Sequence, residues 1–123
     1  MSDVGLLSAR LMTPYNVILS DINFGGEAKG AITENYVAQQ LAAKGRSLYY
    51  WESEGRAETD FLLQTDDGAV PVECKAGEHV RSRSLASSYI PKYHPPYSIR
   101  ISSKNFGFEN GIKSVPLYAV WCI

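Results

Sequence analysis

The feature that most constrains the fold of this chain is a short turn sequence between two segments of alternating polarity. The turn is Asp66-Asp67-Gly68, a combination of residues typical of a tight β-hairpin. Residues 57–64 precede the turn and residues 69–75 follow it, and apolar side chains recur at every second position in both. Alternation of this kind predicts strands with one buried face. We therefore expect an antiparallel hairpin in this part of the chain.

The length of the hairpin loop decides which residues face each other. A loop of residues 66–67 places Asp60 opposite Glu73. A loop of residues 67–68 instead places Asp60 opposite Lys75. In both registers Asp60, Glu73 and Lys75 share one face, because opposed residues of a pair point the same way. The other face collects apolar side chains that are expected to contact the core, namely Phe61, Leu63, Val70, Val72 and Cys74.

A further carboxylate lies on a predicted helix. Residues 27–44 have helical periodicity and end in a lysine followed by a glycine. Glu34 belongs to a stripe with Val37, Ala38 and Leu41 that has the spacing of a buried helix face. A carboxylate on a buried stripe requires a compensating charge, and the hairpin adds two more carboxylates. A divalent cation would stabilise all three, and oxygen ligands favour Mg²⁺ or Mn²⁺ over Zn²⁺.

The charges are unevenly distributed along the chain. The formal net charge is −1, which does not indicate a general polyanion binder. Residues 52–67 carry six acids and one arginine, whereas residues 75–104 carry six bases and one acid. Either this arrangement places a metal beside a phosphate-binding surface, or it forms two solvated faces that neutralise each other. A salt bridge at a sheet edge would equally explain Glu73 and Lys75 taken alone.

The remaining segments predict a mixed α/β domain with the order helix, three strands, helix, strand, strand. The first dozen residues resemble a short apolar helix, and Asn105-Phe-Gly and Asn110-Gly111 are predicted turns. The other segments are predicted as strands over residues 47–52, 97–102 and 115–122, and as a helix over residues 81–90 that stops near Pro91.

Cysteine usage and hydropathy bear on the location of the protein. No apolar run is long enough to span a bilayer, and the first residues lack the basic region of a secretory signal. The two cysteines, Cys74 and Cys122, belong to no CxxC pair and are expected to be buried thiols in a reducing compartment. We expect a cytoplasmic protein that contacts no membrane.

The acids of the hairpin resemble the motif of the PD-(D/E)xK nuclease superfamily. The similarity consists of Glu58-Thr-Asp60 followed by Val72-Glu73-Cys-Lys75, with Glu34 on a preceding helix. The order of elements is also similar to the superfamily's restriction-endonuclease-like αβββαβ core, which has a mixed central sheet. More narrowly, the chain resembles the uncharacterised C-terminal domain of bacterial and archaeal AAA-type ATPases in the segments KGAITENYVAQQL, YYWESEGRAETDFLL, VPVECKAG and IRISSKNFGFENGIKSVPLYAVWCI.

This resemblance implies one domain over residues 1–123, in which residues 1–26 are a partial N-terminal extension, shorter than in the family. It also implies Mg²⁺- or Mn²⁺-dependent hydrolysis of DNA phosphodiesters. The metal ligands would be Asp60, Glu73 and the backbone carbonyl of Cys74, and Glu34 would complete the site. Lys75 would orient the attacking water and offset charge in the transition state. Phosphates of the DNA would contact Arg81, Arg83 and Lys92.

Two other functions remain open on the sequence. Relatives carry an ATPase domain, whereas this chain has no GxxxxGK[ST] motif. The missing motor and the near-neutral charge would suit a catalytically inactive module that binds nucleic acid or docks a partner protein. Tyr89, Tyr93 and Tyr97 surround a proline-rich corner and would suit a homodimer, although core packing explains them equally well.

Overall fold

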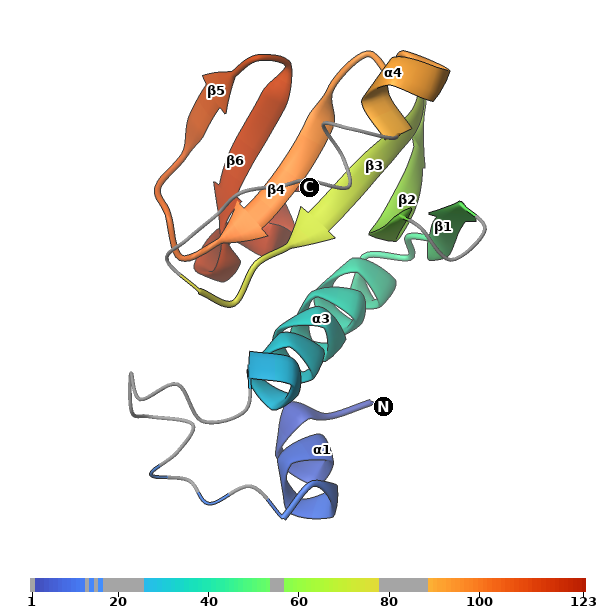
Figure 1. Ribbon diagram of the computed structural model, residues 1–123. Helices are drawn as coiled ribbons and strands as arrows, with labels where there is room; N and C mark the ends of the chain where they lie inside the picture. The colour runs from blue at the N-terminus through green and yellow to red at the C-terminus, as the bar shows by residue number, and fades with distance from the viewer. Residues whose placement is uncertain (1, 13, 15, 17–25, 54–56, 78–88) are drawn as a thin grey trace.

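The computed structural model describes residues 2–12, 14, 16, 26–53, 57–77 and 89–123 (Figure 1). One six-stranded mixed sheet, with the order β1-β2-β3-β4-β6-β5, forms the centre of this mixed α/β fold. The elements in chain order are α1 (Val4–Arg10), α3 (Gly26–Ala43), β1 (Tyr49–Ser53), β2 (Ala57–Thr65), β3 (Gly68–Cys74), α4 (Ile90–Tyr93), β4 (Ser98–Ser102), β5 (Gly107–Glu109), β6 (Ile112–Pro116) and the 3₁₀ helix η2 (Leu117–Cys122).

The β2–β3 hairpin has the first of the two predicted registers. Phe61 pairs with Val72 and Thr65 pairs with Gly68, which leaves Asp66 and Asp67 as the two-residue loop. Gly68 has φ +121°, a conformation that side-chain-bearing residues rarely adopt. The glycine at this position therefore permits the turn that sets the register of the whole hairpin.

Helix α3 confirms the helix predicted over residues 27–44 and ends in a Schellman motif. The Gly45 N–H donates to the Ala42 carbonyl at 2.9 Å, and the Arg46 N–H donates to the Leu41 carbonyl at 3.1 Å. Gly45 takes the left-handed conformation that this motif requires, with φ +75°. The capped end fixes the direction in which the chain leaves α3 toward β1.

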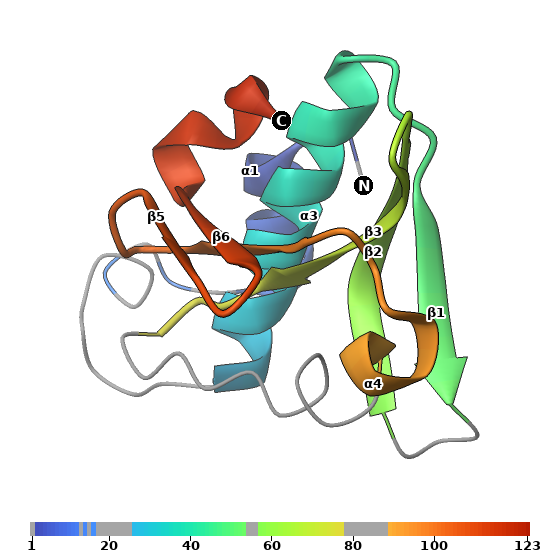
Figure 2. The ribbon, with the colours of Figure 1, turned by 90° about the horizontal axis from the view of Figure 1, so that it is seen from above.

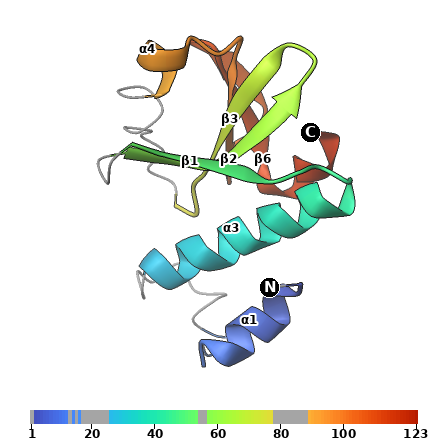
Figure 3. The same cartoon turned by 90° about the vertical axis from the view of Figure 1, so that its right-hand side faces the viewer.

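The hydrophobic core lies between α3, η2 and one face of the sheet. Val37 and Leu41 of α3 are completely buried against it, as the apolar stripe predicts. Figure 3 shows α1, α3 and the sheet as successive layers, with α4 on the opposite side of the sheet from α3. The buried core residues are Val37, Leu41, Leu63, Val70, Val72, Cys74, Ile99, Ile101, Val115, Ala119 and Val120.

The short helix α4 lies beside β1 (Figure 2) and differs from the prediction for this region. Most of the helix predicted over residues 81–90 falls outside the described residues. Pro91 stands in the first turn of α4 and does not stop a helix, because a proline there loses no intrahelical hydrogen bond. Tyr89 is buried with its ring centroid 5.1 Å from that of Trp51, so it is not the exposed contact that the homodimer hypothesis used.

The predicted final strand over residues 115–122 is wrong over most of its length. Strand β6 occupies Ile112–Pro116, and the chain then turns into η2. Pro116 has no N–H to continue a ladder, and a short apolar run does not by itself distinguish a strand from a buried helical turn. Because η2 buries only Ala119 and Val120, Cys122 is exposed, contrary to the expectation that both thiols are buried.

The predicted turns near the C-terminus are partly confirmed. Asn110 and Gly111 both have left-handed φ values, 51° and 74°, and connect β5 to β6 as a tight hairpin. The predicted turn over residues 105–107 ends in the short edge strand β5, Gly107–Glu109, which was not predicted from the sequence. None of the described helices combines the length and apolarity that crossing a membrane requires.

Candidate metal centre

The β2–β3 hairpin brings Asp60 next to the end of β3. The observed ladder ends at the Phe61–Val72 pair, and one further position in the same register would place Asp60 opposite Glu73. At this end the Asp60 side chain turns toward the backbone, and its Oδ2 accepts a hydrogen bond from the Cys74 N–H at 2.6 Å. A charge-assisted hydrogen bond of this length holds the carboxylate in place beside the backbone of β3.

Glu73 is the most deeply buried carboxylate of the described residues. Its side chain is only 4% exposed, and Oε1 lies 2.9 Å from the Lys75 Nζ, whose side chain is 34% exposed. The other oxygen, Oε2, is buried and accepts no hydrogen bond from any described residue. Leaving a buried charged oxygen without a partner is costly, so Oε2 is a position where a cation would be stabilised.

Glu34 approaches the same place from α3 but is not buried. The prediction that it lies on the buried stripe is therefore wrong at this position. The reason is that the core contacts of α3 begin at Tyr36 and Val37, just after Glu34. The charges of the hairpin nevertheless act on Glu34. Partial burial, and then the charges of Asp60 and Glu58, raise the pKa of Glu34, while the charge of Lys75 lowers it.

The carboxylates of this region destabilise one another's charge. Burial is the largest cause that raises the pKa of Asp60, and Glu73 and Glu58 raise it further. The hydrogen bond from Cys74 and the charge of Lys75 act in the opposite direction. Burial also raises the pKa of the Cys74 thiol well above its ordinary value, and Asp60, Glu34 and Glu73 add to that effect. Raised pKa values with these causes are expected where several acidic groups lie close together with too little positive charge nearby.

Arg100 lies beside this site, and its position there was not predicted from the sequence. In the parallel β3–β4 pair it lies directly beside Glu73, and the Lys75 N–H continues the ladder by donating to the Ile101 carbonyl at 2.8 Å. The Arg100 Nε is buried and has no hydrogen-bond partner among the described residues. A single arginine in the otherwise apolar and small-residue segment Ser98–Ser102 is the signal that could have identified it.

The donor set suits a hard cation that keeps part of its hydration shell. Within the described part of the chain, no group of three or more His, Cys, Asp or Glu side chains has an arrangement that could hold a metal. Mg²⁺ is commonly held by one or two carboxylates while several of its waters remain. Asp60 and Glu73 would supply the two carboxylates. They fit this role because the Glu73 Oε2 is buried and has no partner in the described part of the chain. We call Glu34, Asp60, Glu73 and Lys75 the acidic site.

Of the three residues predicted to contact phosphates, only Lys92 is among the described residues. Arg81 and Arg83 lie outside the described residues. Lys92 is exposed on α4, with its Nζ 5.0 Å from the centroid of the Tyr93 ring. The Tyr93 hydroxyl accepts a hydrogen bond from the Trp51 Nε1 at 3.1 Å, which links α4 to β1. Trp51 pairs with Thr59, the residue that precedes Asp60, so this aromatic contact lies close to Asp60 along the sheet.

Fold and site together define a mixed α/β domain with acidic side chains gathered at the end of an antiparallel hairpin. A model of the family described as a domain of unknown function, DUF4143, matches residues 29–120. The match covers most of the chain, and the chain belongs to this family. No curated protein and no solved structure matches it significantly.

Proposed function

We propose that this domain is a Mg²⁺-dependent phosphodiesterase that acts on DNA, built on a restriction-endonuclease-like core. The observation that carries the proposal is the buried Oε2 of Glu73, which has no hydrogen-bond partner among the described residues, in the carboxylate that Lys75 contacts. The order α3, β1, β2, β3, then α4 and β4, together with the mixed sheet, supports the core. The proposal includes membership of the PD-(D/E)xK superfamily, a relationship to the C-terminal domains of AAA-type ATPases and action in the cytoplasm.

The acidic site would hold the cation through Asp60, Glu73 and the backbone carbonyl of Cys74. Glu34 would bind directly or through water, in keeping with its exposure and its electrostatic coupling to Asp60. Bound Mg²⁺ or Mn²⁺ supplies Lewis-acid polarisation of the scissile phosphate. The cation also offsets the mutual repulsion that raises the pKa of Asp60 and of Glu34.

Lys75 is placed to act on the phosphate. Its backbone is fixed by the hydrogen bond to Ile101, and its ammonium group is partly exposed while it contacts Glu73. If Glu73 bound a cation in place of this ion pair, the Lys75 ammonium group would be free to donate hydrogen bonds to a phosphate oxygen or to the attacking water. In either position it offsets negative charge that grows in the transition state.

The test is a cleavage assay on single-stranded, duplex and branched DNA with Mg²⁺ or Mn²⁺. Glu73→Gln and Lys75→Gln should each lower the cleavage rate by roughly a hundredfold or more. Glu109→Gln and Lys104→Gln change the same residue types at exposed positions outside the acidic site and serve as matched controls. Failure of the wild-type protein to cut any of these DNAs, or equal rates for wild type and Lys75→Gln, would contradict the proposal.

A second candidate is a catalytically inactive module that binds nucleic acid or a partner protein. It is favoured by the Lys75–Glu73 ion pair and by the hydrogen bond from Cys74 to Asp60, which already engage one oxygen of each acid. Calorimetric titration separates the two functions. Uptake of Mn²⁺ that is lost in Asp60→Asn supports the enzyme, whereas salt-dependent DNA binding without metal uptake supports the inactive module.

A further inference from the structure

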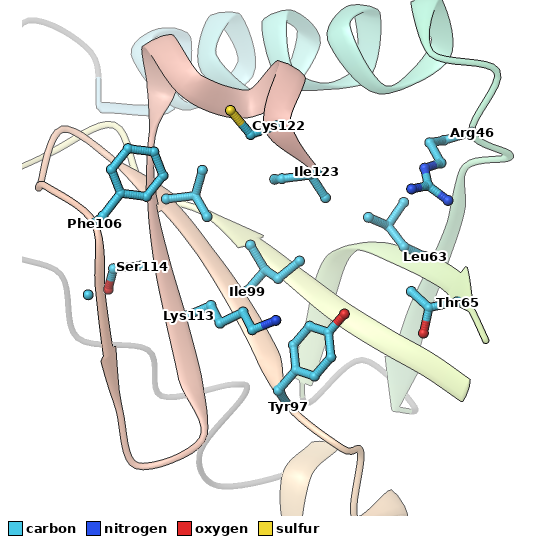
Figure 4. A pocket seen from close by; sticks show the side chains of 12 residues that line it. Arg46, Leu63, Thr65, Tyr97, Ile99, Phe106, Lys113, Ser114, Cys122 and Ile123 are labelled. Atoms are coloured by element: carbon cyan, nitrogen blue, oxygen red, sulfur yellow. The ribbon is translucent and has the colours of Figure 1, made fainter. Parts of the chain in front are cut away.

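A cavity of about 530 Å³ lies away from the acidic site, between the C-terminal end of the chain and the sheet (Figure 4). It is bounded by the end of η2, by strands β2, β4 and β6, and by Arg46 just after α3. This volume is typical of sites that enclose a small molecule. None of Glu34, Asp60, Glu73 or Lys75 lines it, so it is separate from the site described above. We call it the C-terminal cavity.

The surface of the cavity is mainly apolar, with two cationic side chains. Leu63, Ile99 and Val115 of the core contribute to its walls. Arg46 and Lys113 are exposed and also line it, and Figure 4 shows the Lys113 amine directed toward Tyr97. The Lys113 Nζ lies 3.8 Å from the centroid of the Tyr97 ring. The cavity therefore joins an apolar interior to positively charged groups.

The side chains that line the cavity carry positive charge. Arg46 and Lys113 are among the described lining residues, and no Asp or Glu side chain is. Neither Arg46 nor Lys113 forms an ion pair with a described residue. A cation beside an apolar wall attracts an anion more strongly than the same cation in open water, because the local dielectric constant is lower. The side chains of this cavity therefore suit a ligand that joins a negative charge to an apolar body.

We propose that the C-terminal cavity binds a small amphipathic anion, with a single carboxylate or phosphate head group and an apolar body. The head group would accept charge-assisted hydrogen bonds from Lys113 or Arg46. The body would cover Leu63, Ile99 and Val115 and gain from the removal of apolar surface from water. This binding is independent of the proposed phosphodiesterase, since the two sites share no side chain.

The test compares ligands that have the same tail and different head groups. Octanoate and octyl phosphate carry the anion, octanol is neutral and octylammonium is positive. Binding is followed through methyl and amide NMR signals of the full chain. We expect at least one of the two anions to bind about tenfold more tightly than octanol, and octylammonium to bind most weakly. The signals of Leu63, Ile99 and Val115 should move, and whichever anion binds more tightly identifies the head group.

Variants of the cavity connect the binding to the two cations. Lys113→Gln and Arg46→Gln should each weaken binding of the preferred anion several-fold and leave octanol binding unchanged, while Lys104→Gln is the matched control. Cys122→Phe, which fills the cavity from an exposed position, should weaken anion and alcohol alike. Equal affinity for octanol and both anions would overturn the proposal. So would shifts confined to other surfaces, or full affinity in both glutamine variants.

Discussion

The acidic site and the C-terminal cavity are both formed on the same sheet, but they differ in charge and in burial. The acidic site has buried negative charge, whereas the cavity has exposed positive charge. At the acidic site Glu73 is almost completely buried, and one of its oxygens has no partner among the described residues. At the cavity Arg46 and Lys113 are exposed on long side chains that reach water. Burial makes a charge costly, whereas exposure does not. We therefore expect an ion bound at the acidic site to change the stability of the fold. At the cavity, we expect the charges to determine which ligand binds and to have little effect on stability.

The largest expected effect is stabilisation by Mg²⁺ at neutral pH. At a concentration a hundredfold above its dissociation constant, a ligand that binds only the folded state adds about 2.7 kcal/mol to the free energy of unfolding. Urea denaturation in Mg²⁺ and in EDTA measures this gain. Asp60→Asn should abolish the gain and Glu109→Gln should keep it. A gain of equal size in Asp60→Asn would show that the cation binds elsewhere.

A pH dependence follows from the raised pKa values of Asp60 and Glu34. In the unfolded chain these groups titrate near 3.9 and 4.3, so between those values and the raised ones the folded state binds more protons. Stability in EDTA should therefore fall as pH rises through this window and should level off above it. Asp60→Asn should make the fall shallower. Because the ligands must lose protons to bind a metal, Mg²⁺ should stabilise the protein only above the window.

The hairpin turn that aligns the acidic site should tolerate no side chain at Gly68. Gly68→Ala should lower the free energy of unfolding by about 1 kcal/mol or more, because φ +121° strains an alanine although space for its Cβ is open. Gly30→Ala is the matched control, since Gly30 lies within α3 with nothing within 4 Å of an added Cβ. That change should stabilise the fold by about 0.5–1 kcal/mol. Loss of stability in both variants would contradict a specific role of the turn.

The smallest effect is expected at the cavity. Lys113→Gln removes one exposed cation–π contact with Tyr97 and should cost about 0.5 kcal/mol. Arg46→Gln should change stability less, because its side chain has no ion pair among the described residues. Denaturation of both variants without ligand provides the measurement. A loss as large as that of Gly68→Ala would show that the cations of the cavity are structural.

Local sequence signals were sufficient to predict the hairpin and α3, but they left two registers of the hairpin open. In the structure the loop is Asp66-Asp67 and Gly68 has a positive φ, which selects one register and brings Asp60 to the end of β3. The apolar stripe of α3 likewise predicts the burial of Val37 and Leu41. These features depend on residues that are close in the chain or on a regular period.

Other features depend on contacts that no local pattern contains. The exposure of Glu34 follows from where α3 begins to touch the sheet, and the pairing of Arg100 with Glu73 follows from a parallel connection between distant segments. The change from strand to 3₁₀ helix after Pro116 depends on η2 packing against α3, where the Lys44 Nζ donates to the Trp121 carbonyl at 2.6 Å. Tertiary packing decides each of these outcomes.

The central claim is that buried acids of the hairpin bind a divalent cation. A crystal soaked in Mn²⁺ and measured at the manganese absorption edge tests this claim most directly. We predict an anomalous peak between the carboxylates of Asp60 and Glu73, with the Lys75 ammonium group displaced from Glu73. No peak at this position, with Lys75 still paired to Glu73 at saturating Mn²⁺, would contradict the account.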